Sequence, residues 1–81
     1  MNHNLETEIR DIIAEIVELD SEEIQPDSNL VQDLGADSMS ALELMASLEN
    51  KYDLVIKPEF LPELNTLENT TKLIQELLAE K

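Results

Sequence analysis

Few residues in this 81-residue chain are of the types that perform catalysis. It contains no cysteine and a single histidine, His3, which leaves neither a cysteine nucleophile nor a plausible serine–histidine–aspartate triad. With one glycine it has no glycine-rich phosphate loop, and its acids do not follow the spacing of a calcium-binding loop or a transition-metal site. We therefore predict neither catalytic residues nor a metal site.

The residues that stand out are Asp37 and Ser38, which lie where a helix is predicted to begin. A serine on the first helical turn is open to a modifying enzyme. The free backbone N–H groups and the helix dipole there favour an anionic phosphodiester. Gly35 should permit a close approach of the preceding loop. Both residues are also common helix caps, so from these residues alone an ordinary capping role stays open.

The charge balance restricts the partners of the chain. Nineteen acids face five bases, which gives a formal net charge of −14, and residues 11–50 contain no lysine or arginine. Such a chain should repel nucleic acid and anionic membranes, and should attract basic proteins in a salt-dependent manner. A surface that is merely soluble and self-repelling is the other interpretation of this composition.

Length and composition predict one domain over residues 1–81. No apolar run approaches the length of a membrane span, and residues 1–11 lack the apolar region of a signal peptide. We therefore expect a cytoplasmic protein, and a monomer.

Apolar periodicity predicts an all-α fold, a small four-helix bundle with a long ordered loop between the first two helices and a short third helix. The first helix should fade near residues 19–21, and its stripe is Leu5, Ile9, Ile12, Ile13 and Ile16. Residues 20–36 should form the loop, with a turn near Pro26. Four apolar residues should pin it to the bundle: Ile24, Leu30, Val31 and Leu34.

The second helix should run from residues 37–38 to about Lys51, with a core face of Ala41, Leu44, Met45, Leu48 and Tyr52. Residues 57–64 contain two prolines and are predicted as one short helix or an irregular turn. Asn65 or Thr66 should cap the last helix. Its stripe is Leu67, Thr70 or Thr71, Ile74, Leu77 and Leu78. No strand is convincing, although residues 54–56 are ambiguous.

The stretch from Asp33 to Leu44 reads DLGADSMSALEL and, with residues 45–49, closely resembles the phosphopantetheine attachment region of acyl carrier proteins. The resemblance runs over nearly the whole chain. It implies that a phosphopantetheinyl transferase moves 4′-phosphopantetheine from coenzyme A to Ser38, with magnesium, and that Asp37 belongs to the motif this enzyme reads. The chain would then be no enzyme but a carrier of acyl thioesters for fatty acid, lipid or polyketide-type biosynthesis.

The resemblance also implies a recognition surface along the second helix. By position it comprises five residues: Met39, Leu42, Glu43, Ala46 and Glu49. The apolar members would enter a pocket of acyl-transferring and acyl-modifying enzymes, and the acids would meet basic residues of those enzymes. Alternatively, the two glutamates form an ordinary solvated face.

Family members can also shelter the acyl chain between their helices. Candidates for this role are Ile9, Leu44, Met45, Leu48, Phe60, Leu64 and Ile74, with plain core residues as the other interpretation.

The sequence departs from the family pattern at Met39, where leucine is usual, at Ser40, where aspartate is usual, and at residues 49–51, where the acidic run is interrupted. The third element is usually short and acidic, but here it carries Pro58, Phe60, Leu61 and Pro62. These changes motivate the hypothesis of a specialised carrier in a dedicated pathway. A peptidyl or aryl carrier with the same arm, and an unmodified acidic adaptor that binds a basic partner, are the alternatives.

Overall fold

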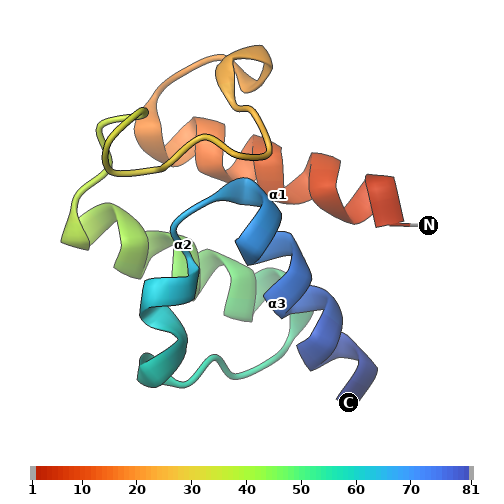
Figure 1. Ribbon diagram of the computed structural model, residues 1–81. Coiled ribbons are helices and arrows are strands. Elements are labelled where there is room, and N and C mark those ends of the chain that lie inside the picture. Colours follow the sequence, from red (N-terminus) through yellow and green to blue (C-terminus); the bar gives the residue numbers. More distant parts are fainter. Residues whose placement is uncertain (1, 81) are drawn as a thin grey trace.

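The computed structural model describes the backbone of residues 2–80 and the side chains of residues 5–80, so the side chain of His3 lies outside it. Within this range the chain forms three α-helices and two short 3-10 helices, and no strand. Their order is α1 (Asn2–Val17), η1 (Ser21–Glu23), α2 (Ser38–Tyr52), η2 (Pro58–Glu63) and α3 (Leu67–Glu80). The predicted all-α bundle is confirmed, and η2 is its short third helix (Figure 1).

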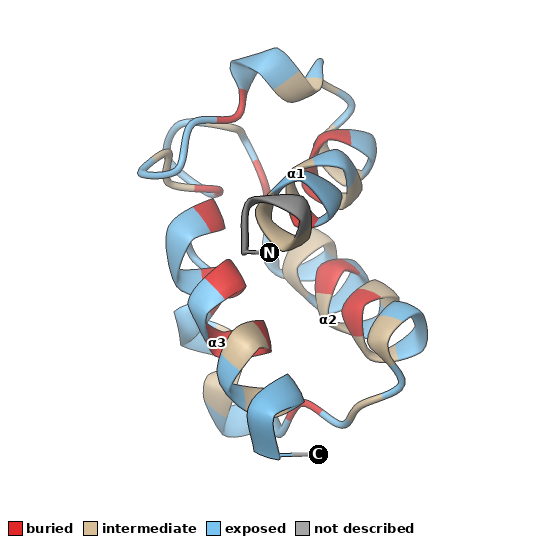
Figure 2. Cartoon of the chain, turned by 90° about the vertical axis from the view of Figure 1, so that its right-hand side faces the viewer, coloured by how far each residue is buried: buried red, intermediate tan, exposed pale blue. Residues whose placement is uncertain are grey.

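The core lies between the three α-helices, whose buried residues face one another (Figure 2). On α1, Ile9 and Ile13 are buried and the rest of the predicted stripe packs against them. On α2, Leu44 and Leu48 are buried as predicted. Burying each such side chain contributes about 1.5–3 kcal/mol, so these contacts fix the position of α2 in the bundle.

Two apolar residues do not lie where the sequence pattern places them. Val31 is 60 % exposed, because its neighbour Leu30 takes the inward position in the loop. Leu78 is 36 % exposed, whereas its neighbour Leu77 packs against the core. Leu73 is buried on α3 instead.

The cap of α3 follows from local chemistry. Thr66 is the capping residue of the two predicted, since its Oγ1 accepts a hydrogen bond from the N–H of Asn69 at 3.0 Å. Both Thr70 and Thr71 are then buried in the first turns of the helix.

The long connection between α1 and α2 is ordered, as predicted. Ile24 and Leu30 are buried in the core. The N–H of Leu30 donates to the carbonyl of Asn65 at 2.8 Å, and the N–H of Glu68 donates to the carbonyl of Pro26 at 2.9 Å. These bonds join the connection to the start of α3, so its course does not depend on apolar contacts alone.

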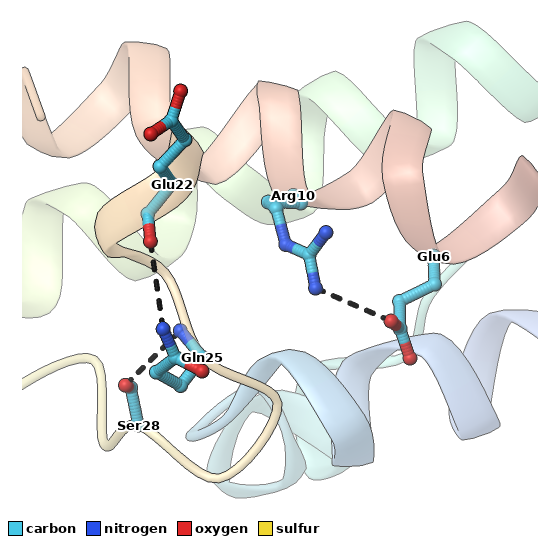
Figure 3. A network of polar contacts seen from close by, with 5 residues as sticks. All are labelled: Glu6, Arg10, Glu22, Gln25 and Ser28. Carbon is cyan, nitrogen blue, oxygen red and sulfur yellow. Dashed lines mark hydrogen bonds and ion pairs between the residues drawn. The ribbon is translucent and has the colours of Figure 1, made fainter. Parts of the chain in front are cut away.

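Short-range polar contacts stiffen the first half of this connection (Figure 3). The N–H of Gln25 donates to Ser28 Oγ at 3.2 Å, and Gln25 Nε2 donates to the carbonyl of Glu22 at 3.4 Å. In the same view, Arg10 on α1 pairs with Glu6 one turn earlier at 3.3 Å. A helical pair of this spacing at the surface contributes only about 0.3–0.5 kcal/mol.

Candidate functional site

A tight turn leads the chain toward α2. Asn29 Oδ1 accepts hydrogen bonds from the N–H groups of Val31 at 3.0 Å and Gln32 at 2.9 Å. In the reverse direction, the N–H of Asn29 donates to Asp33 Oδ2 at 2.8 Å. Asparagine and aspartate are suited to such turns because their short side chains bond to nearby backbone. This turn orients the residues that follow it toward the start of the helix.

Gly35 is required for its backbone conformation. Its φ is +76°, in the left-handed region that favours glycine. A Cβ at this position would meet no atom within 4 Å, so the predicted close approach of the loop is not the reason for the glycine. The next residue, Ala36, is buried and its N–H donates to the carbonyl of Leu30 at 2.8 Å. The left-handed conformation at Gly35 thus places Asp37 where it caps α2.

Asp37 is the N-cap of α2. Its Oδ1 accepts hydrogen bonds from the N–H of Ser40 at 2.9 Å and from Ser40 Oγ at 3.1 Å. These two bonds, with the backbone bond foremost, lower the pKa of Asp37 below its usual range. The carboxylate is exposed, and its lowered pKa keeps it charged further into the acid range than an ordinary aspartate.

Ser38 is the first residue of α2, and it is exposed. The first N–H groups of an α-helix have no partner within the helix, and the helix dipole places partial positive charge there. A phosphodiester on the Ser38 hydroxyl fits this environment. The fold thus holds the predicted attachment residue at the surface, on a helix that the core fixes in place.

A shallow groove of about 390 Å³ runs beside Ser38. We call it the Ser38 groove; its walls are Val31, Asp37, Ser38, Ala41, Pro58, Leu61 and Pro62. Most of these walls are apolar, and they come from the connection, from α2 and from η2. The groove is therefore a largely apolar surface beside the serine.

A second, smaller cavity of about 30 Å³ lies deeper between α1, the connection and α2. Of the seven residues predicted as candidates for sheltering cargo, only Leu44 and Leu64 line it. The other five lie in the core or pack against it. A cavity of this volume holds about one water molecule, so an acyl chain would need the helices to separate.

Four of the five predicted recognition residues share one exposed face of α2. Met39 is 65 % exposed and Leu42 is 45 % exposed, and Glu43 and Ala46 are exposed as well. Large apolar side chains exposed on a small acidic protein are typical of a contact surface. This face begins directly after Ser38.

Glu49 differs from the other four. It is half-buried, and its Oε2 accepts a hydrogen bond from the N–H of Ile56 at 2.8 Å. Ile56 is buried and lies in the segment that leads to η2. The structure therefore gives this carboxylate a contact within the fold, which the helical spacing of the sequence did not reveal.

Sequence reasoning also missed Ser40 and Val31. Ser40 was identified only as a departure from the family pattern, although its spacing of three residues from Asp37 is the spacing of a helix cap and its partner. Val31 was expected in the core, yet it lines both the Ser38 groove and the deeper cavity. No sequence signal distinguished its outward direction from that of Leu30.

Comparison with known proteins gives a family match over most of the chain. Residues 7–74 match the family model described as the phosphopantetheine attachment site. Acyl carrier proteins from strains Tuc7, 5A and APS of Buchnera aphidicola subsp. Acyrthosiphon pisum are each 36 % identical over 72 residues. Each match covers 89 % of this chain and 90 % of the relative.

The fold is also found among solved structures. The solution structure of the apo doublet acyl carrier protein from prodigiosin biosynthesis matches with a TM-score of 0.79 at 24 % identity. The match covers 91 % of this chain and 36 % of that chain, and it shows a shared fold. In the described part of this chain, no helix is long and apolar enough to cross a membrane. The match over residues 7–74 and the three relatives show that the chain belongs to the acyl carrier proteins, the family that holds acyl groups on covalently attached 4′-phosphopantetheine.

Proposed function

We propose that Ser38 is the residue to which the 4′-phosphopantetheine arm is attached. The observation that carries this proposal is the exposed position of Ser38 on the first turn of α2, inside the stretch that matches the attachment-site family. Gly35, with its left-handed backbone conformation, and Asp37, the helix cap, precede Ser38 and position it at the start of α2. The Ser38 groove gives the arm an apolar surface beside its attachment point.

The chemistry of attachment follows from the serine hydroxyl. Ser38 Oγ forms a bond to the phosphorus of the pantetheine phosphate, and the pyrophosphate bond of coenzyme A breaks to release 3′,5′-adenosine diphosphate. The hydroxyl proton passes to a base of the transferase. When bound, the arm supplies a terminal thiol for thioester formation, which this chain cannot supply because it has no cysteine.

We infer that the exposed face of α2 receives the partner enzymes. Met39, Leu42 and Ala46 supply apolar contact, and Glu43 supplies a negative charge for a basic partner. The net charge of −14 steers basic surfaces toward the chain from a distance. The transferase and the acyl-transferring and acyl-modifying enzymes are the partners of this kind.

In this proposal the chain acts as one carrier domain in the cytoplasm and performs no catalysis of its own. The departures at Met39, at Ser40, at residues 49–51 and in the third element support service in a dedicated pathway rather than bulk fatty acid synthesis. If the ketosynthases and reductases of bulk fatty acid synthesis used this chain as well as their own carrier, the dedicated pathway would be refuted.

The test of the attachment residue is an intact mass measured before and after incubation with coenzyme A, Mg²⁺ and a broad-specificity phosphopantetheinyl transferase. We expect the wild-type chain to gain one phosphopantetheinyl mass and Ser38→Ala to gain none. Ser47→Ala, a serine change on the same helix away from the attachment site, is the matched control and should be loaded like the wild type. Circular dichroism verifies that each variant is folded.

An unmodified adaptor predicts the opposite result. If the folded wild-type chain gains no mass, and did not already carry the arm, the carrier function is contradicted and a search for a basic partner protein becomes the next step. If Ser38→Ala is still loaded, another residue holds the arm.

A further inference from the structure

Ser40 contacts Asp37, the residue directly before the proposed attachment residue Ser38. Its N–H and its hydroxyl both donate to Oδ1 of Asp37, at 2.9 Å and 3.1 Å. Both bonds end on the same carboxylate oxygen. An ionised aspartate at position 40, the usual residue of the family, would have no side-chain proton to donate and would add a second negative charge to the turn.

We propose that Ser40 is a positioning residue for the attachment reaction, holding the carboxylate of Asp37 in one orientation beside Ser38 before the transferase binds. This inference rests on the proposed function of Ser38. Asp37 is fully exposed, so its side chain would rotate more freely with the backbone bond alone. Fixing the carboxylate in advance reduces the entropy lost when the transferase binds.

The surroundings of Ser40 support a fixed orientation. Its side chain is half-buried, and together with Asp37 it provides the polar part of a cavity wall whose other residues are apolar. A hydroxyl in such a place needs a hydrogen-bond partner, and Asp37 is the partner it has. The lowered pKa of Asp37, caused first by the backbone bond and then by the hydroxyl of Ser40, is consistent with a held carboxylate.

The experiment is steady-state kinetics of loading from coenzyme A and Mg²⁺ by a broad-specificity transferase, with the carrier as the varied substrate. For Ser40→Ala we expect the KM for the carrier to rise about three- to tenfold with kcat unchanged, the loss expected for one hydrogen bond. Ser40→Thr keeps the hydroxyl and should restore the wild-type KM. Ser47→Ala, also half-buried on α2, is the matched control and should behave like the wild type.

A second measurement does not depend on the transferase. In the unmodified protein, the pKa of the Asp37 carboxyl, followed by ¹³C NMR, should rise in Ser40→Ala and stay at the wild-type value in Ser40→Thr. An unchanged KM in folded Ser40→Ala, or a lower kcat with the wild-type KM, would overturn the proposal. A wild-type chain that is never loaded would instead refute the proposed function, and the NMR titration would then show whether Ser40 holds Asp37.

Discussion

The two ends of α2 use similar residues for different purposes. At the N-terminal end, Asp37 bonds only within its own turn, and Ser38 and Glu43 are exposed. At the C-terminal end, Glu49 accepts a hydrogen bond from the N–H of Ile56. The side chains at one end are therefore exposed, while those at the other end hold segments of the fold together. Two glutamates on the same helix, Glu43 and Glu49, can thus have unrelated roles.

Tyr52 adds a second contact at the C-terminal end. Its hydroxyl donates to Glu8 Oε1 on α1 at 2.7 Å, which joins two helices that are far apart in the sequence. Replacing residues at this end should change the stability of the fold, whereas replacing those at the N-terminal end should change loading and partner binding.

The largest effect on stability is expected for Glu49→Ala. This change leaves the N–H of the buried Ile56 without its acceptor, at a cost of about 1–3 kcal/mol in the free energy of unfolding. Glu43→Ala should change the free energy of unfolding by less than about 0.5 kcal/mol, because Glu43 is exposed. Urea unfolding followed by circular dichroism measures both variants.

Glu49→Gln is the control for this comparison, because its amide oxygen still accepts a hydrogen bond. It should recover most of the stability that alanine loses. If Glu43→Ala and Glu49→Ala were equally destabilising, the distinction between the two ends of α2 would be wrong.

A smaller loss is expected for Tyr52→Phe. Removing the hydroxyl removes the bond to Glu8 and should cost about 0.5–1.5 kcal/mol. In the wild type, burial and then the bond to Glu8 raise the pKa of Tyr52 well above its usual value. The stability that this bond contributes is present below pH 10.0, the ordinary value, and is lost as the pH rises through the raised value.

Absorbance reports this titration directly, because Tyr52 is the only tyrosine and the chain has no tryptophan. The phenol should ionise at higher pH in the folded chain than in urea. Glu8→Gln should bring the two titrations closer together. A folded chain whose phenol titrates as it does in urea would contradict the contact between α1 and α2.

The smallest effect on stability is expected for Asp37→Asn. Asparagine also caps helices well, so this change removes the charge and keeps the cap. Because the pKa of Asp37 is lowered in the fold, its charge stabilises the protein above the ordinary value of 3.8, and this contribution is lost as the pH falls through the folded value. The difference in Tm between wild type and variant should therefore be present at neutral pH and vanish in acid.

Other carboxylates titrate in both proteins and cancel in that difference. A Tm difference that grew on acidification would mean that Asp37 is destabilised in its charged form. Loading should be affected more than Tm, since the charge lies next to Ser38.

Much of the fold could be predicted because it depends on local pattern. The spacing of Ile9 and Ile13, and of Leu44 and Leu48, placed both helices and their buried faces. The start of α2 at Ser38 followed from the capping preference of Asp37.

The direction of side chains in irregular segments could not be predicted. Helical periodicity does not apply to Val31, which lies in the irregular connection. It also does not predict the course of the chain after α2, and this course brings the N–H of Ile56 to Glu49. The bond between Asp37 and Ser40 was within reach, because cap and partner are three residues apart. The sequence therefore predicted which residues form the candidate site, but it predicted their contacts only in part.

The backbone bonds that tie Leu30 to Asn65 and Pro26 to Glu68 have a consequence for the order of events during synthesis. The segment before Ser38 obtains these partners only when the start of α3 has left the ribosome. Until then α2, at 15 residues, is about as short as an isolated helix can be and still be marginally stable in water. A transferase that requires this connection to be fixed against α3 would thus act only after the start of α3 has emerged.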